Sequence, residues 1–198
     1  MKFKEYILEN EDIDSIISKI KNNCQPFLKD WLPINKKIIG QEAALYSGRR
    51  GENTKIVFRK LNVRKNRKPS MTNGITHKYL DEIFDELFKI KARSQCLFAT
   101  SSYQQSTMYG YPYIVFPIGR YEVIWSSNVP DLYTSLVDAA LQFGDYDELY
   151  DFINNADYKK GNLKNAIYSR CEIMVYCNKV YLLKNGEYDM KELKEKLK

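Results

Sequence analysis

The irregular succession of helices and strands is the feature that most constrains the fold of this chain. Between residues 95 and 126, three short apolar or alternating runs are bounded by Gly, Ser and Pro, and they predict strands over 95–101, 111–119 and 121–126. The helical segments around them do not alternate regularly with strands, as they would in a doubly wound sheet. This order predicts an α+β fold rather than a parallel α/β fold.

Apolar residues at helical spacing predict the helices. The clearest case is 76–91, where Leu80, Ile83, Phe84 and Leu87 recur at i, i+3, i+4 and i+7, with Thr76 as the expected N-cap. Further helices are predicted over 4–21, 131–144, 145–157 and 189–198, with a short helical turn within 101–110.

The remaining strands are predicted on both sides of this central region. Residues 42–47 lead as a strand into Gly48, and residues 54–63 form the next one, followed by a polar, basic loop over 64–74. The neighbouring runs 171–177 and 179–184 are expected to pair with each other as an antiparallel hairpin around Asn178.

Prolines indicate where the chain divides. Pro26 and Pro33 follow the first predicted helix and interrupt regular structure there. We therefore expect an N-terminal helical appendage over residues 1–38 and a main domain over residues 39–198.

Composition excludes several classes of protein. The 198 residues carry 31 Lys and Arg against 25 Asp and Glu, and this net charge of +6 permits an anionic partner without requiring one. A single histidine, His77, rules out a zinc site built on two histidines. The four cysteines show no CxxC spacing, the N-terminus is too charged for a signal peptide, and no apolar run is long enough to span a membrane. We therefore expect a cytoplasmic protein with reduced thiols that binds no metal.

An acidic cluster near residue 145 is the only group of carboxylates that suggests a metal. Its members lack the spacing and the glycine of an EF-hand and stand at a predicted helix start, which favours a solvated helix face. The cluster consists of Asp145, Asp147, Glu148 and Asp151.

Three polar clusters interrupt the apolar strands, and the first is LYSGRRG, residues 45–51. Arg49 and Arg50 offer guanidinium forks that suit a phosphate or diphosphate, and Gly48 allows the backbone to approach a ligand closely. The same residues are also typical of a basic turn at a strand end.

The second and third clusters carry hydroxyls and a carboxylate. Thr100, Ser101 and Ser102 follow an apolar strand and can hold a ribose or orient a catalytic group, although hydroxyls also end strands for local reasons. Glu172 opens a late apolar strand, where a carboxylate can accept a proton or hold a hydroxyl, or can simply lie at a solvated strand edge.

In this order, the three clusters resemble the mono-ADP-ribosyltransferase family of the arginine–serine–glutamate type. LYSGRRG is similar to the family's LYRG start, FATSS to its Ser-Thr-Ser strand, and SRCEIMVYCNKVYLL to its Glu-bearing strand and the strand that follows, so the resemblance covers residues 42–185. FPIGRYEVIWS further resembles proteins of tailed bacteriophages with this presumed fold. The implied fold is an ADP-ribosyltransferase-like split β-sandwich with an N-terminal helical appendage.

The resemblance implies an enzyme that transfers ADP-ribose from NAD to a protein or nucleic-acid acceptor, in the host cytoplasm if a phage encodes it. Glu172 would hold the ribose 2′-hydroxyl, Ser101 would position Glu172, and an Arg of the first cluster would converge with them within roughly 10 Å. One or more of Tyr103, Tyr109, Tyr111 and Tyr113 would stack on nicotinamide. The NAD-binding residues that the resemblance implies are Tyr46, Gly48, Arg49, Arg50, His77, Thr100, Ser102 and Tyr109.

Three positions qualify these expectations. Ser47 stands where LYRG has its Arg, so that Arg49 or Arg50 would have to replace it. Arg170 stands where many protein-modifying members have Glu or Gln. The acceptor would then be a nucleic acid or a small molecule, or the protein would be an inactive scaffold without an acceptor. His77 has three interpretations: a ribose or phosphate contact, a catalytic base, or a solvent-exposed residue at a helix start, which we prefer.

Two other functions compete with the transferase. A catalytically silent phage protein that binds a host factor would explain Ser47 and Arg170. A nucleic-acid-binding module, with interleaved tyrosines that stack on bases, would explain six basic residues within the ten positions 59–68. The same basic residues would serve a transferase as its acceptor surface, which we expect to consist of Arg59, Arg64, Lys65, Arg67, Lys68 and Arg170.

Overall fold

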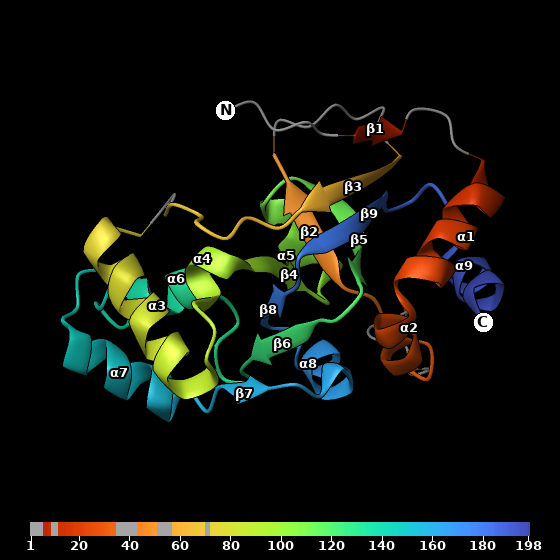
Figure 1. The fold of residues 1–198 in the computed structure, drawn as a ribbon. Helices are drawn as coiled ribbons and strands as arrows, with labels where there is room; N and C mark the ends of the chain where they lie inside the picture. Colours follow the sequence, from red (N-terminus) through yellow and green to blue (C-terminus); the bar gives the residue numbers. More distant parts are fainter. Residues whose placement is uncertain (1–5, 9–11, 35–42, 51–56, 70–71) are drawn as a thin grey trace. The chain divides into compact units, whose positions relative to one another are not determined.

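The chain forms two compact units, each assembled from separate stretches of sequence. The computed structural model describes residues 6–8, 12–34, 43–50, 57–69 and 72–198. Unit 1 comprises Met1–Asn62, Ala99–Tyr121 and Cys177–Lys198, and unit 2 comprises Val63–Phe98 and Glu122–Tyr176 (Figure 1). The expected boundary at residue 38 therefore falls inside unit 1.

An antiparallel sheet forms the centre of unit 1. Its strands follow the order β1-β3-β9-β5-β2, and the last residue of β4, Thr100, pairs with Tyr46 of β2. The bounds are β1 (Tyr6–Leu8), β2 (Tyr46–Arg49), β3 (Phe58–Asn62), β4 (Cys96–Thr100), β5 (Tyr111–Ile118) and β9 (Lys179–Lys184).

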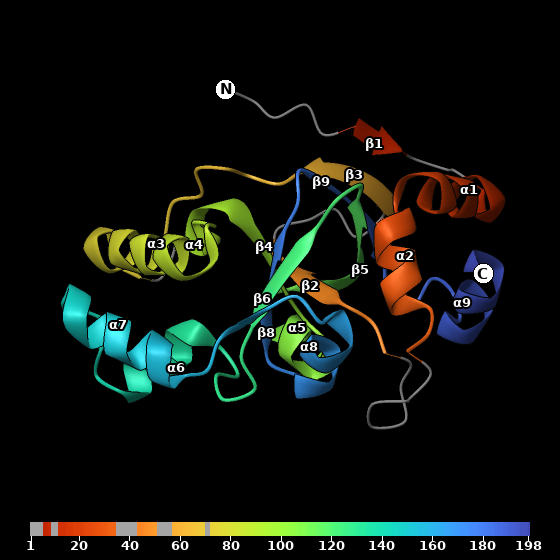
Figure 2. The same cartoon turned by 60° about the horizontal axis from the view of Figure 1, so that its bottom comes forward.

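Helices α1 and α2 contact β5 of this sheet, and α9 lies beside α1 (Figure 2). Phe27 and Trp31 of α2 and Phe116 of β5 form the aromatic part of the core, with ring centroids 5.7 to 6.0 Å apart. The bounds are α1 (Ile13–Asn23), α2 (Gln25–Trp31), α5 (Tyr103–Met108) and α9 (Met190–Leu197).

The predicted helix over residues 4–21 is wrong at its beginning and its end. Tyr6–Leu8 form a strand, and the helix begins at Ile13 because the Asp12 side chain accepts a hydrogen bond from the Ser15 N–H and caps it. Pro26 does not end regular structure, because it lies in the first turn of α2, where a missing N–H costs nothing.

Unit 2 contains a second group of strands in the order β4-β8-β6-β7. Strand β6 pairs antiparallel with β8 on one side and with β7 on the other. Only the first three residues of β4 belong to this unit. The bounds are β6 (Glu122–Trp125), β7 (Lys159–Lys160) and β8 (Glu172–Tyr176).

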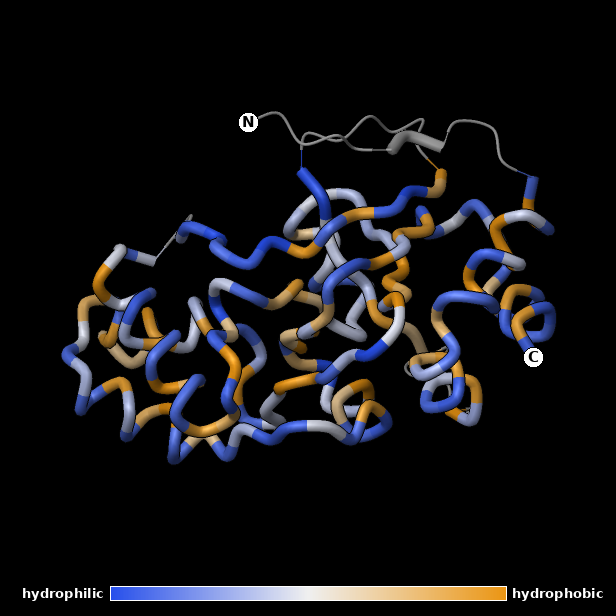
Figure 3. The backbone as a smooth tube through the Cα atoms, viewed as in Figure 1, coloured by the Kyte–Doolittle hydropathy of each residue, from blue (hydrophilic) through white to orange (hydrophobic). Residues whose placement is uncertain are grey.

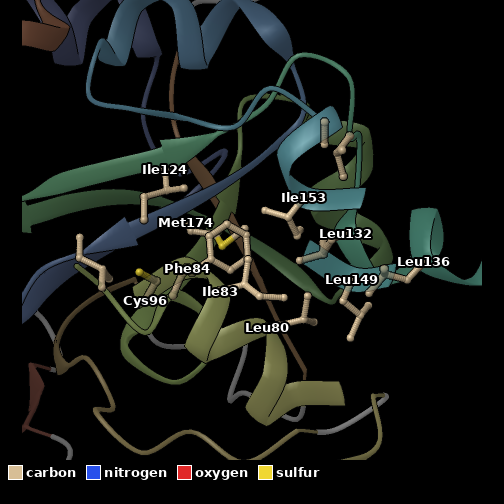
Figure 4. Close-up of a cluster of buried hydrophobic side chains, with 14 residues drawn as sticks. Leu80, Ile83, Phe84, Cys96, Ile124, Leu132, Leu136, Leu149, Ile153 and Met174 are labelled. Carbon is tan, nitrogen blue, oxygen red and sulfur yellow. The ribbon is translucent and has the colours of Figure 1, made fainter. Parts of the chain in front are cut away.

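Helices α3, α4, α6 and α7 of unit 2 contribute to a hydrophobic core (Figure 4). Hydrophobic and hydrophilic stretches follow one another along α3 and α7 (Figure 3). The apolar face of each helix is buried in this core and carries Leu80 and Ile83 on α3 and Leu149 and Ile153 on α7. The bounds are α3 (Gly74–Phe88), α4 (Ala92–Gln95), α6 (Leu132–Asp138), α7 (Tyr146–Asn155) and α8 (Leu163–Ser169).

Local hydrogen bonds shift three predicted helix ends. Asn73, and not Thr76, caps α3, because its side chain accepts hydrogen bonds from the N–H groups of Ile75 and Thr76. Lys89, with a φ of 60°, ends that helix, and Ala140, with a φ of 57°, follows the early end of α6. Left-handed backbone of this kind is typical of helix C-termini.

The predicted hairpin of residues 171–177 and 179–184 is wrong. Strand β8 pairs with β6 in unit 2, whereas β9 pairs with β3 and β5 in unit 1. The chain passes from one unit to the other between Tyr176 and Cys177, so the neighbouring runs complete different groups of strands. Helix α8 and strand β7 were not predicted, since each is too short to show a period.

Other expectations agree with the described residues. The overall class is α+β. Cys24, Cys96, Cys171 and Cys177 are all buried thiols. None of the helices in the described part of the chain has the length and apolar character needed to cross a membrane.

Candidate functional site

Glu172 opens β8 and is held at both its backbone and its carboxylate. Its N–H donates to the Pro130 carbonyl over 2.8 Å, and the backbone N–H of Leu132 donates to its carboxylate. Strand β8 itself is fixed by its register with β6, where Val175 lies opposite Val123. The segment before α6 and the start of β8 together place this carboxylate.

Arg93 is the partner of Glu172. The Arg93 Nη1 lies 3.3 Å from the Glu172 Oε1, and each of the two side chains is 12% exposed. Arg93 belongs to α4, which contacts β8 and precedes β4. The pair is therefore a largely buried ion pair within unit 2, where loss of one partner leaves an uncompensated charge.

Burial dominates the ionisation of Glu172 and raises its pKa to about 7. Arg93 opposes this shift, the nearby Asp131 adds to it, and Arg67 and the Leu132 N–H oppose it. The partly buried Tyr158 also has a raised pKa, chiefly because of desolvation and in part because of the Glu172 charge. A carboxyl group that titrates near neutrality can work as a base, as an acid or as a switchable charge.

A second arginine, Arg67, lies beside this pair. The guanidinium carbons of Arg67 and Arg93 lie 4.3 and 4.4 Å from the centroid of the Phe98 ring. Burial lowers the pKa of Arg67 to about 10, and the like charge of Arg93 adds to this, while Glu172 opposes it. Two guanidinium groups therefore share one aromatic ring and one carboxylate.

The polar network of His77, Ser94 and Asp81 supports both arginines. The Ser94 hydroxyl contacts the Asp81 carboxylate and lies 3.1 Å from the His77 Nε2, and the Ser94 N–H donates to Asp81 over 3.0 Å. The Arg67 N–H in turn donates to the Ser94 carbonyl over 3.1 Å. The network thus ties the loop that carries Arg67 to the helix that carries Arg93.

The preferred interpretation of His77 as a solvent-exposed residue is wrong. His77 is 8% exposed, and burial lowers its pKa, although Asp81 opposes the shift, so the ring is neutral at pH 7. Asp81 and Ser94 both lie on the Nε2 side of the ring. In a Ser-His-Asp triad the carboxylate and the hydroxyl are on different ring nitrogens, so this network is not arranged as such a triad.

Gly48 of the first cluster serves packing within unit 1. A Cβ on Gly48 would collide with the carbonyl oxygen of Ser106 and lie 2.7 Å from the Cβ of Tyr109. The backbone of Gly48 is therefore approached closely by helix α5, where we expected a ligand. Arg49 lies opposite Tyr111 in the β2–β5 register, and the exposed Arg50 donates to the Met108 carbonyl over 3.4 Å.

The hydroxyl run ends β4 and starts α5. The Thr100 hydroxyl donates to the Gln105 Oε1 over 2.8 Å, and the Ser102 side chain caps α5 by accepting from the Gln105 N–H over 3.2 Å. These contacts match the local interpretation of Thr100 and Ser102. Ser101 is 6% exposed.

The tyrosines proposed for stacking differ in their exposure. Tyr103, Tyr109 and Tyr111 are 36% to 49% exposed and are accessible to a ligand. Tyr113 is fully buried under the Arg59 guanidinium, 4.9 Å away, and is therefore excluded from stacking. Tyr46 is also buried and packs edge-on against Tyr103.

The basic stretch is not one continuous surface. Arg59 is 2% exposed, which corrects its assignment to an acceptor or nucleic-acid surface. Arg64, Lys65 and Lys68 are exposed, with the Lys65 ammonium 4.2 Å from the Tyr176 ring. Arg170 adopts left-handed backbone, with a φ of 61°, at the C-cap of α8.

The structure therefore brings together some expected residues and leaves others in separate units. Arg49 and Ser101 lie in unit 1 and Glu172 in unit 2, so their convergence stays a prediction. Within unit 2, Glu172 is joined by Arg93, Arg67 and Asp131, of which the sequence analysis singled out only Arg67, and that as a surface residue. The available signal was the polar Arg93-Ser94-Gln95 segment directly before the apolar run of β4.

No group of three or more metal-binding side chains occurs within the described ranges. No protein-family model, curated protein or solved structure matches this chain. The function is therefore inferred from the site itself.

Proposed function

We propose that the chain is an NAD-dependent mono-ADP-ribosyltransferase in which Glu172 is the catalytic carboxylate. The observation that carries this proposal is the placement of Glu172. Its carboxylate is held by Arg93 and the Leu132 N–H at the start of a strand, and its pKa is raised to about 7. Perturbed ionisation combined with fixed orientation is typical of catalytic groups.

The reaction breaks the bond between ribose C1′ and the nicotinamide nitrogen, and nicotinamide leaves with the electron pair. Positive charge then develops on the ribose, and the ionised Glu172 stabilises it because the attraction grows as the charge forms. Glu172 also accepts a hydrogen bond from the ribose 2′-hydroxyl. The acceptor nucleophile attacks C1′, forms the new bond to ribose and releases its proton to water.

Arg93 has a positioning role in this scheme. It favours the ionised form of Glu172 against the effect of burial, and its single 3.3 Å contact with Oε1 restricts the carboxylate while leaving Oε2 without an ion-pair contact to Arg93. Activity that depends on ionised Glu172 should therefore rise with pH through an apparent pKa near 7.

The test compares two glutamates that each open a strand of unit 2. Glu172→Gln keeps the size and removes the charge, and we expect NAD consumption to fall at least ~10²-fold, the scale of losing one preorganised electrostatic group. Glu122→Gln, at the exposed start of β6, is the matched control and should consume NAD at the wild-type rate. Equal NAD consumption by Glu172→Gln and wild type would overturn the proposal.

A second candidate is a catalytically silent protein that binds a host factor. The ion pair itself favours this alternative, since Arg93 neutralises the carboxylate that catalysis needs. The two candidates differ in one experiment. A silent binder consumes no NAD in its wild-type form, and it captures its partner equally well with Arg49→Gln or Glu172→Gln.

A further inference from the structure

Two arginines of unit 2 lie against the ring of Phe98. Because both guanidinium carbons lie within 4.4 Å of the ring centroid, the two cations are no farther apart than the sum of those two distances. Glu172 makes an ion pair with Arg93, and within the described residues Arg67 has no carboxylate within 4.0 Å. The two arginines therefore have one ion-paired carboxylate between them, and the Asp131 charge lies near that carboxylate.

The donors of both arginines are incompletely used. Arg93 reaches Glu172 through Nη1 alone, and its buried Nε has no hydrogen-bond partner among the residues that the structure describes. The guanidinium of Arg67 makes no hydrogen bond in that same part of the chain, and it lies against the Phe98 ring. The Arg93 Nε is a buried donor without an acceptor, which is costly, whereas no nitrogen of Arg67 is among the buried donors without a partner. The unused donors of Arg67 can therefore bind an acceptor supplied from outside the chain.

The position of Arg67 does not depend on such an acceptor. Its N–H bonds to the Ser94 carbonyl, and Ser94 is fixed by Asp81 and His77. The guanidinium is therefore held near Arg93 by the backbone and by the ring. This preorganisation removes part of the entropic cost of binding an anion.

We propose that Arg67 and Arg93 form a phosphate-binding site beside Glu172. Two guanidinium forks match the charge and the several oxygens of a phosphate or diphosphate better than a single carboxylate does. The site itself is inferred from unit 2 alone, whereas the identification of its ligand as the diphosphate of NAD rests on the proposed function. In that case Arg67, and not Arg49 or Arg50, is the arginine that decides NAD affinity.

The site is tested with inorganic pyrophosphate, titrated calorimetrically in a phosphate-free buffer of low ionic strength. We expect wild type to bind pyrophosphate and Arg67→Gln to bind it at least ~10-fold more weakly, the scale of one charge-assisted contact. Arg120→Gln, which removes an exposed arginine in a turn, is the matched control and should bind like wild type. Absence of binding to wild type at millimolar pyrophosphate, or equal binding by Arg67→Gln, overturns the site.

Thermal unfolding without ligand separates binding from a structural role. Removal of Arg67 relieves its repulsion with Arg93 and its burial as a cation, so Arg67→Gln should melt at or above the wild-type temperature. A lower melting temperature together with unchanged pyrophosphate affinity would make Arg67 structural and overturn the proposal. If Arg67→Gln does not fold, Arg67→Lys, which keeps the charge and removes the fork, replaces it in the titration with the same two outcomes.

NAD kinetics distinguish this proposal from the proposed function. If wild type consumes NAD, Arg67→Gln should raise KM at least ~10-fold while Arg120→Gln leaves it unchanged. Pyrophosphate binding that requires Arg67 without NAD consumption supports the phosphate site and overturns the transferase. NAD consumption with an unchanged KM in Arg67→Gln supports the transferase and overturns the identification of the ligand as the NAD diphosphate, while the pyrophosphate titration decides the site itself.

Discussion

The two units use their polar residues differently. In unit 1 the polar residues of the first two clusters mostly serve local structure: Thr100 and Ser102 bond to the start of α5, and Gly48 makes room for it. In unit 2, Glu172, Arg93 and Arg67 are brought together from separate segments, with only Arg93 in an ion pair with Glu172 and with donors left unused. Polar residues that make hydrogen bonds with the neighbouring backbone contribute to folding. Charges that are buried together at a net cost in folding free energy suggest function.

The largest effect on stability should come from Arg93→Gln. This change leaves Glu172 buried without its partner, and we expect a loss of about 3–5 kcal/mol in the free energy of unfolding at pH 8, measured in urea. The exposed pair of Lys78 and Glu82 is the control, and Lys78→Gln should cost less than about 1 kcal/mol. Equal losses in the two variants would remove the distinction between buried and exposed charge.

The next effect is the pH dependence that Glu172 confers. The folded state raises the pKa of Glu172 from 4.5 to about 7, so it binds the proton more tightly than the unfolded chain does. The resulting stability is fully present below pH 4.5 and is lost as the pH rises through 7, by roughly 3 kcal/mol in total. Urea unfolding of wild type and Glu172→Gln between pH 4.5 and 8 measures it, since the variant should lack this decline. The same slope in both proteins would contradict the assignment.

A smaller effect is expected in unit 1. Gly48→Ala places a Cβ against the Ser106 carbonyl and Tyr109, and we expect a loss of about 1–3 kcal/mol as α5 is displaced. Gly74→Ala, in the first turn of α3, meets nothing within 4 Å and should leave stability unchanged or raise it slightly. If the two alanine variants melt at the same temperature, Gly48 does not serve packing. The polar cluster of unit 1 would then not be explained by local structure, as we contrast it with unit 2.

The smallest effect concerns the cap of α3. Asn73→Ala removes the acceptor for the N–H groups of Ile75 and Thr76 and the donor to the Gln142 carbonyl, and it should cost about 1 kcal/mol. Thr76, the cap expected from the sequence, also donates to that carbonyl over 3.0 Å. A Thr76→Ala variant that melts below Asn73→Ala would restore Thr76 as the more important residue at this helix start.

The sequence predicted most of the elements, Glu172 as a site residue, and Arg67 only as part of a basic surface. Periodic apolar residues located α3 and α7, and bounded apolar runs located β4, β5 and β6, because these patterns arise from burial of one face. Glu172 was singled out because a carboxylate before an apolar strand is conspicuous. Its partner Arg93 was not, because a single arginine near a helix end looks the same whether it faces solvent or a buried acid.

What the sequence determined by itself was the α+β class, the periodic helices and the presence of a carboxylate at the start of β8. Tertiary structure decided which strands pair and which charges meet. The runs 171–177 and 179–184 are separated by one residue, yet they join different units. Pairing depends on which edges are available and which faces are apolar across the whole chain, and the ionisation of Glu172 depends on groups from distant segments. Neither is encoded in the neighbouring residues.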